Sequence, residues 1–316
     1  MPILSRSLHG VTAGCAPSKT SGTLSVKRSA IGGWSQDACR RNVRFLRTVR
    51  QQDLTGDGYS LTLTIGECPQ THEDWHRLLK AYFKRLERLG MIRLHWVIEW
   101  QRRGVPHLHA CAYFPHVARS QVEQHNFEKL LIWEHWMRAG AIEYNSDLRA
   151  QYCLRVYDAV GWFQYVSKHA ARGISHYQRS PECQPKHWEK TGRMWGKRGD
   201  WPTDTPQRYD LDNRGFWAFR RIVRAWRKAD ARSSGTPSRI RSARRMLRCT
   251  HSGKSPVRGV SEWIPADLQT TIIEHLAATG HHVQPAEVAP GRMLAPRPSD
   301  PKTRQHTAAA RAHAAS

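Results

Sequence analysis

The sequence predicts an α+β fold, and three observations support this prediction. The run 59–66 has the hydroxyl-bearing and aliphatic composition of a strand. Apolar residues then recur at helical spacing as far as Gly90. Two more strand-like runs, 94–100 and 105–114, flank a short loop that contains Gly104. Strands and amphipathic helices that follow one another on this scale are typical of layered α+β domains.

Two helices are predicted from the residues of their first turns. Thr71, with Asp74 three residues later, resembles a capping box and predicts that a helix begins there. Ser120 with Glu123 predicts the start of a second helix, which we expect to end near Gly140 because glycine commonly follows a helix. The buried face of the first helix is predicted to contain Trp75, Leu78, Leu79, Tyr82, Phe83, Leu86 and Leu89.

A last pair of short strands completes the predicted sheet. Residues 141–144 and 152–157 have strand composition and suggest another hairpin. The resulting order is strand, helix, strand, strand, helix, strand. This order predicts a ferredoxin-like, or RRM-like, split β-α-β core with a central antiparallel sheet. We expect the helices to cover one face of the sheet and to leave the other face for a site.

Composition divides the whole chain into three regions. We expect residues 1–55 to form a largely flexible basic arm, with a short helix suggested around 38–49, because Ser, Thr, Gly and basic residues predominate at its start. Residues 56–232 form the predicted domain, which ends with an accessory basic helix over 214–232. Residues 233–316 are predicted to be a basic, largely disordered C-terminal region with a short helix within 261–280. The fold class is therefore an α+β core with a C-terminal helical basic extension.

The charge of the chain narrows the choice of partner. Its 50 Lys and Arg residues and 26 Asp and Glu residues give a formal net charge of +24. A chain this basic attracts phosphate, so we expect a nucleic-acid partner, although a solvated surface or tail explains part of the excess. Residues 232–258, which contain basic but no acidic residues, suit DNA binding and a solvated linker equally.

Cysteine usage and hydropathy indicate the compartment. The seven cysteines are scattered, odd in number and without a C-x-x-C pair, which favours reduced thiols over a disulfide framework. The N-terminus lacks the continuous apolar run of a signal peptide, and no window reaches membrane-spanning length. We therefore expect no membrane partner and a cytoplasmic location, in a bacterium or another host cell.

Three residues of the predicted hairpin could bind one divalent metal ion. His107 and His109 leave the same face of a strand because strand side chains alternate. An antiparallel partner strand brings Glu99 to that face if Glu99 pairs with either histidine, whereas a slip of one residue removes it. Two imidazoles and a carboxylate suit several divalent ions. Glu99 is the weakest member, since its place depends on an inferred register.

A second group of polar residues lies on the helix predicted over 159–172. Tyr165, Lys168, His169 and Arg172 share one stripe of this helix because they lie three, four and seven residues apart. Taken alone, such residues are more often packing or surface residues. Beside a metal site, however, a tyrosine surrounded by cations suits phosphate chemistry. We expect Arg102 and Arg103, in the loop before the histidines, to contact DNA together with His169 and Arg172.

The chain resembles the HUH endonucleases, and among them the single-tyrosine initiators of rolling-circle replication in plasmids, filamentous phages and small circular DNA viruses. Three motifs, which occur in the family's order, carry the resemblance. The run 60–64 (S-L-T-L-T) looks like the family's first motif, 106–109 (P-H-L-H) is its His-hydrophobe-His motif, and 165–168 (Y-V-S-K) is similar to its Tyr-x-x-Lys motif. The resemblance covers roughly residues 58–173, which places an HUH endonuclease domain within residues 56–232.

The resemblance implies an enzyme that nicks and rejoins single-stranded DNA. Glu99, which occupies the place of a glutamate in the viral members, and the two histidines would bind Mg²⁺ or Mn²⁺. Tyr165 would attack the scissile phosphate, leaving a 5′-phosphotyrosine link and a 3′ hydroxyl that a polymerase can extend. Lys168 would either favour the ionised tyrosine or neutralise the phosphate. The implied partners are an origin strand or hairpin and a host helicase and polymerase.

The position of a second nucleophile is taken by another residue type. Initiators with two tyrosines carry the second tyrosine one helical turn after the first, where this chain has His169. Completion of a replication round would therefore need a second protomer, renewed use of Tyr165 or another group. An oligomer is compatible with the first of these routes.

Two alternative functions remain open. A related HUH transposase or a mobilisation relaxase would use nearly the same chemistry, and neighbouring genes would distinguish them: a plasmid origin or coat-protein genes indicate replication, whereas flanking palindromes indicate transposition. A basic nucleic-acid-binding protein without catalysis is the third hypothesis. It predicts that Tyr165→Phe leaves every property unchanged.

No convincing nucleotide-binding loop is present. The string Gly253-Lys254-Ser255 has Arg248 where a P-loop needs its first glycine, and no clear strand precedes it. We therefore predict that the purified protein shows no DNA-stimulated ATP hydrolysis and depends on a host helicase for strand separation. A phosphate-release assay with and without single-stranded DNA checks this prediction. ATP turnover that disappears in Lys254→Ala would contradict it.

Overall fold

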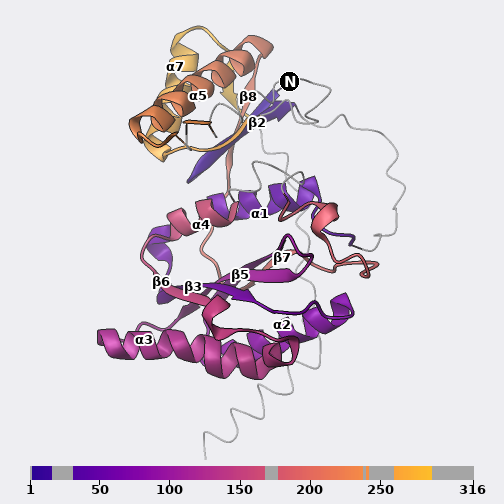
Figure 1. Cartoon of the computed structure of the whole chain (residues 1–316). Helices are drawn as coiled ribbons and strands as arrows, with labels where there is room; N and C mark the ends of the chain where they lie inside the picture. Colours follow the sequence, from indigo (N-terminus) through magenta and orange to yellow (C-terminus); the bar gives the residue numbers. More distant parts are fainter. Residues whose placement is uncertain (1, 16–30, 168–176, 238–239, 242–259, 287–316) are drawn as a thin grey trace, which may run out of the picture. The chain divides into compact units, whose positions relative to one another are not determined.

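Two five-stranded antiparallel sheets organise the part of the chain that the structure describes (Figure 1). The structure is a computed structural model, and it describes residues 2–15, 31–167, 177–237, 240–241 and 260–286. Each sheet has its own cluster of buried apolar side chains. The predicted α+β class is therefore confirmed.

The first sheet contains the predicted split core. Its strands lie in the order β6-β3-β5-β4-β7, and each neighbouring pair is antiparallel. The helices α2 and α3 connect β3 to β4 and β5 to β6, so β3 to β6 follow the predicted ferredoxin-like order. The elements are β3 (Asp57–Thr64), α2 (His72–Arg88), β4 (Arg93–Trp100), β5 (Pro106–Phe114), α3 (Gln121–Leu130), β6 (Tyr152–Val156) and β7 (Trp195–Gly199).

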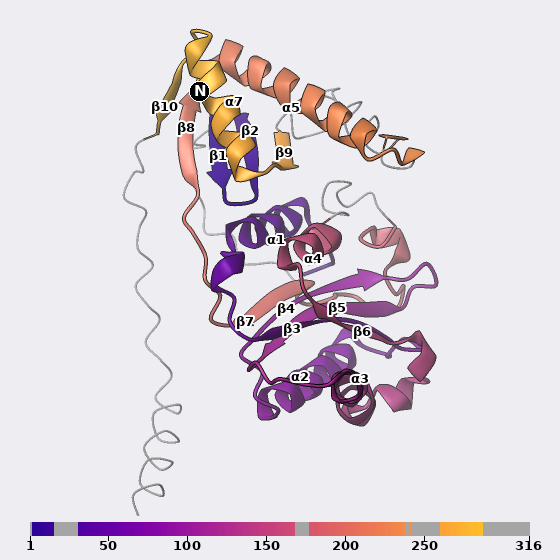
Figure 2. The same ribbon diagram turned by 90° about the vertical axis from the view of Figure 1, so that its left-hand side faces the viewer.

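Helices cover both faces of this sheet (Figure 2), which corrects the prediction of one free face. The helices α2 and α3 lie on one face, and α1 (Gln36–Thr48) and α4 (Ala159–Ser167) lie on the other. On β4, Trp96 contacts Phe83 of α2, whereas the preceding residue, His95, contacts Trp162 of α4. His95 lies on the same face of the strand as Glu99. The prediction was wrong because the helix suggested around 38–49, which is α1, packs on the sheet and is not part of a flexible arm. Its Asn42 holds the buried His95 ring by a 2.8 Å hydrogen bond.

The predicted helix boundaries are confirmed by their caps. The Thr71 hydroxyl accepts a hydrogen bond from the Asp74 amide at the start of α2, and Ser120 and Glu123 form a complete capping box at α3. Beyond Leu130, helical turns continue through a π-helical turn (Leu131–Trp136) and a 3₁₀ turn (Met137–Ala139). They end at Gly140, whose φ of 120° is one that side-chain-bearing residues rarely adopt.

One predicted strand is wrong. Residues Ala141–Tyr144 form a 3₁₀ helix between Gly140 and the left-handed Asn145, so only β6 joins the sheet, beside β3. The Tyr144 carbonyl instead accepts hydrogen bonds from the amides of Gly66 and Glu67 at 2.9 Å. The turn thus anchors the loop that follows β3. Other 3₁₀ turns are Gln51–Asp53, Leu148–Ala150 and Pro181–Cys183.

The second sheet combines two N-terminal strands with strands from residues 207–285, in the order β10-β8-β1-β2-β9. Residues 2–15 are thus strands, which corrects the expectation of a flexible arm for this part of 1–55. The helix α5 and part of the region 260–285 also belong to this second core, and not to the first domain or to a disordered region. The elements are β1 (Pro2–Ser7), β2 (Gly10–Cys15), β8 (Gln207–Leu211), α5 (Asn213–Ser233), β9 (Val260–Trp263), α7 (Ala266–Ala278) and β10 (Val283–Pro285).

The amphipathic character predicted for the accessory helix is confirmed in α5. Phe216, Phe219 and Val223 are buried in the second core, whereas Arg221 and Arg224 are exposed on the other side of the helix.

Two further properties concern the helices and the cysteines. None of the helices in the described ranges combines the length and apolar character needed to cross a membrane. Cys39, Cys68, Cys111, Cys153 and Cys183, the cysteines for which a thiol state is described, are all free thiols.

Strand β1 should be indispensable to the second core. Leu4 is completely buried there, so we predict that Leu4→Ala lowers the free energy of unfolding by about 2–5 kcal/mol through lost contacts and a cavity. Val122→Ala, at a side chain that is 70% exposed, is the matched control and should change it by less than about 0.5 kcal/mol. Urea denaturation followed by tryptophan fluorescence measures both. Equal stability of the two variants would show that the N-terminal residues are an arm after all.

Candidate active site

The register of the central hairpin brings the three predicted metal ligands to one face. Glu99 on β4 pairs with His107 on β5, and Val97 pairs with His109. Glu99 and both histidines therefore point away from α2 and toward the α1 and α4 side. The loop between the strands is closed by hydrogen bonds from Gln101 to Val105 and from Gly104 to Gln101, both 2.9 Å between amide and carbonyl. One of the two registers allowed by the sequence is thus the one observed.

The ligand atoms of these residues form a compact cluster. One atom from each of Glu99, His107 and His109 lies within 4.8 Å of the others. The two Nε2 atoms of the histidines are 2.8 Å apart, and His109 Nε2 lies 3.5 Å from Glu99 Oε2. Two imidazole nitrogens and one carboxylate oxygen are a donor set that fits a divalent ion with positions left for other ligands. Glu99 is 2% exposed and His109 5% exposed, whereas His107 is half-buried, so the cluster is open to ligands on the side of His107.

The surroundings keep both imidazoles suited to binding a metal. A 2.9 Å hydrogen bond joins Thr62 Oγ1 on β3 to His109 Nδ1, which leaves His109 Nε2 directed at the cluster. Burial, and secondarily the neighbouring His109, lowers the pKa of His107 to about 3. His107 is therefore neutral at physiological pH, which is the form that donates a nitrogen lone pair. Thr62 lies in the first of the sequence motifs.

Tyr165 on α4 lies beside this cluster. Its ring centroid is 5.8 Å from that of His109, with the two planes at 82°, and its side chain is 47% exposed. Asp158 stands before the helix and its carbonyl accepts a hydrogen bond from the Trp162 amide, so α4 begins as predicted. Partial burial, followed by the negative charge of Glu99, raises the pKa of the Tyr165 phenol. Ionisation of this phenol therefore calls for a cation nearby.

The structure describes only two of the other predicted site residues, Arg102 and Arg103. Lys168, His169 and Arg172 lie outside the described residues, so their roles stay predictions. Arg102 is exposed and its guanidinium lies 5.0 Å from the centre of the Tyr177 ring. Arg103 donates hydrogen bonds to the carbonyls of Ile65 and Gly66 and to the Gln101 side chain. Its guanidinium therefore braces the β4–β5 loop against the end of β3, a role the sequence analysis did not foresee.

Sequence reasoning also missed a buried arginine at the site. Arg179, which is 1% exposed, donates from Nε and Nη2 to Glu99 Oε1 at 3.2 and 3.1 Å. The same Nη2 donates to the Val166 carbonyl at 2.9 Å. Its guanidinium lies 4.1 Å from the centre of the Trp34 ring, and the Trp34 indole donates to the Ile98 carbonyl at 2.8 Å. One arginine among 50 basic residues carries no sequence signal of such a position.

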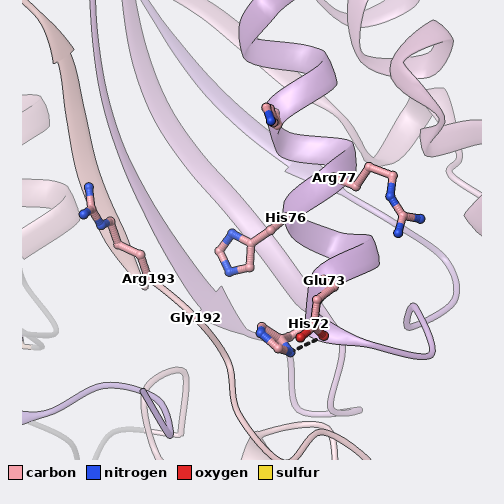
Figure 3. A pocket seen from close by; sticks show the side chains of 7 residues that line it. His72, Glu73, His76, Arg77, Gly192 and Arg193 are labelled. Atoms are coloured by element: carbon pink, nitrogen blue, oxygen red, sulfur yellow. Dashed lines mark ion pairs between the residues drawn. The ribbon is translucent and has the colours of Figure 1, made fainter. Parts of the chain in front are cut away.

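A separate pocket lies on the other side of the first sheet. Its volume is about 500 Å³, and α2 supplies most of its lining (Figure 3). His72 Nδ1 lies 2.6 Å from the Glu73 carboxylate, and His76 Nε2 donates to the Thr191 carbonyl at 2.8 Å. Because α2 covers the sheet face opposite Glu99, this pocket is not part of the candidate site. Its lining residues are His72, Glu73, His76, Arg77, Lys80, Gly192 and Arg193.

The sequence is similar to a known protein family and to proteins of similar length. The family described as replication-associated protein ORF2/G2P matches residues 58–170, which include the candidate site. The replication-associated protein G2P of Pseudomonas phage Pf3 is 47% identical over 255 residues, which is 80% of this chain and 89% of the phage protein. A candidate replication protein of Xylella fastidiosa strain 9a5c is 44% identical over 290 residues, which is 90% of this chain and 99% of that protein.

A second Xylella fastidiosa protein, a candidate replication protein of strain Temecula1, is 46% identical over 270 residues, covering 83% of this chain and 99% of its own length. No solved structure matches the chain. These relatives match most of this chain at 44–47% identity, and the family match includes Glu99, the histidine pair and Tyr165. The chain therefore belongs to the family of ORF2/G2P replication-associated proteins.

Proposed function

We propose that this protein is an HUH endonuclease that initiates rolling-circle replication by nicking single-stranded DNA at an origin. The observation that carries the proposal is the position of Tyr165, a half-exposed phenol whose ring lies 5.8 Å from that of His109 in a cluster of three metal-ligand residues. A nucleophile that is accessible to a strand and adjacent to a cation site has the parts needed for transfer of a phosphodiester to the enzyme.

Glu99, His107 and His109 would hold the metal ion. When bound, a divalent ion supplies Lewis acidity that withdraws charge from the scissile phosphate. The two histidine nitrogens favour Mn²⁺ over Mg²⁺ in affinity, whereas the hard carboxylate oxygen accepts either ion and Mg²⁺ is the more abundant in cells. The low pKa of His107 keeps its ring neutral, so ion binding at neutral pH does not require a proton to leave this residue.

Tyr165 performs the covalent step. Its phenol oxygen loses its proton and bonds to the phosphorus, while the bond from phosphorus to the 3′ oxygen breaks and that oxygen takes up a proton. The products are a 5′-phosphotyrosine and a free 3′ hydroxyl that a host polymerase can extend. Joining is the same reaction reversed. Lys168 is proposed to stabilise the phenolate or the phosphate, since burial and Glu99 make ionisation of Tyr165 harder.

We propose that basic residues near the site bind the DNA strand. Arg102 stands exposed in the loop beside the histidines, and we propose that it contacts the strand together with His169 and Arg172. The relatives are named for replication, and one of them is a phage protein, which supports replication over transposition or mobilisation. A host helicase would separate the strands, in keeping with the absence of a P-loop pattern from the sequence.

Removal of the phenol oxygen of Tyr165 tests the proposed nucleophile. We predict that wild-type protein with Mn²⁺ forms an adduct with labelled, origin-containing single-stranded DNA that survives denaturing electrophoresis, and that Tyr165→Phe forms none although it still binds the strand. Tyr157→Phe is the control, because Tyr157 is also an exposed tyrosine, at 83%, but precedes α4. Adduct formation by Tyr165→Phe, or none by wild type, would overturn the proposed function.

The metal cluster can be tested through one ligand. We predict that chelation abolishes adduct formation, that added Mn²⁺ restores it, and that His109→Ala reduces its rate by more than the about 10- to 100-fold typical of losing an outer partner of a metal site. His125→Ala, at an exposed histidine of α3, should keep the wild-type rate. Rates are measured on single-turnover time courses. A chelator-insensitive reaction would exclude the metal-dependent mechanism.

A further inference from the structure

Arg179 is a charged side chain that contacts both halves of the candidate site. It donates two hydrogen bonds to Glu99 Oε1 and a third to the Val166 carbonyl, which belongs to the residue directly after Tyr165. The side chains of Arg179 and Glu99 are 0% and 2% exposed, so water competes little for these bonds. A single rigid guanidinium thus joins the metal-ligand carboxylate on β4 to the helix of the nucleophile.

We propose that Arg179 is a positioning residue that fixes Glu99 and Tyr165 relative to each other; this inference rests on the proposed function. The carboxylate of Glu99 has two oxygens, and the guanidinium engages Oε1. The other oxygen, Oε2, is the one that lies 3.5 Å from His109 Nε2. Arg179 therefore sets which oxygen faces the histidine pair, as outer partners of metal ligands commonly do.

The arginine is itself held in one orientation. Trp34 lies under the guanidinium at 4.1 Å, and its indole is anchored to the carbonyl of Ile98, the residue before Glu99. The Cys39 sulfur lies 3.5 Å from Nη1. A planar fork that is stacked on an aromatic ring can hold Glu99 and the Val166 carbonyl together, whereas the compact ammonium of lysine has no such geometry.

A role in stability alone does not account for this arrangement. Buried ion pairs contribute little net stability, because desolvation of both charges offsets their attraction, and replacement of both partners by apolar residues is often neutral. The structure contains a suitable comparison in Arg93, a buried arginine at the far end of β4. Arg93 donates to the carbonyls of Asp200 and Thr55 at 2.9 and 3.0 Å, and it contacts no candidate site residue by these bonds.

The first test measures metal binding without DNA. Calorimetric titration with Mn²⁺ should show that Arg179→Met weakens binding by about 10- to 100-fold, as expected for loss of an outer partner of a ligand. Arg179→Lys keeps the positive charge and is expected to fold, and it should lose a smaller part of the affinity. Arg93→Met should bind Mn²⁺ like wild type. Wild-type affinity in folded Arg179→Met and Arg179→Lys would overturn the proposal.

The second test separates positioning from substrate binding. At saturating Mn²⁺, Arg179→Lys should lower the rate constant of adduct formation by at least about tenfold, because Tyr165 is misplaced, and leave the DNA concentration for half-maximal rate unchanged. An unchanged rate constant would overturn the link to Tyr165. The two proposals fail differently: if wild type forms no adduct, the proposed function fails whatever Mn²⁺ titration shows, whereas normal Mn²⁺ binding and rate in Arg179→Lys refute the positioning role alone.

Discussion

The antiparallel register between β4 and β5 is the constraint on which the candidate site depends. Because strand side chains alternate, the pairing of Glu99 with His107 places both, with His109, on one face, and a slip of one residue would direct Glu99 into the α2 side. Packing on the opposite face and a loop contact both oppose that slip. Ile98 and Leu108 are buried on the opposite face, and Arg103 ties the loop to the carbonyls that follow β3. Packing of the core therefore fixes the position of the ligands.

The buried negative charge of Glu99 influences the other groups of the candidate site. A carboxylate that is 2% exposed loses most of its hydration and needs compensating charge. Arg179 supplies it at one oxygen, and a divalent ion would supply it at the other. Partial burial, followed by the negative charge of Glu99, raises the pKa of the Tyr165 phenol, so the proposed nucleophile is sensitive to the charge at the candidate metal site. An ion bound by Glu99 would offset the carboxylate's effect on the phenol, which would couple occupancy of the proposed site to ionisation of Tyr165.

Local signals in the sequence predicted the first core and the cluster, and non-local contacts account for the errors. Alternation gave the shared face of His107 and His109, and first-turn residues gave the starts of both helices. Glu99 could be placed only to within two registers, since nothing local chooses between them. Arg179 was missed because its environment is built by segments that are far apart in sequence, among them Trp34 from the supposed arm. A buried arginine and an exposed one look the same in a sequence.

The second core eluded prediction for a related reason. Strands β1 and β2 pair with β8 and β9, about 200 and 250 residues away, so their stability comes from partners that no local window contains. Their buried residues are few, with Leu4, Val11 and Ala13 the chief ones, and a polar strand of this kind resembles a linker. The first core is thus inserted between the N-terminal hairpin and β8 of the second.

The family match ends at residue 170, within the first core, whereas the Xylella relative aligns over 290 residues, so similarity extends into the chain segments that build the second core. The segments that build the second core therefore form one folded unit and are not a pair of tails.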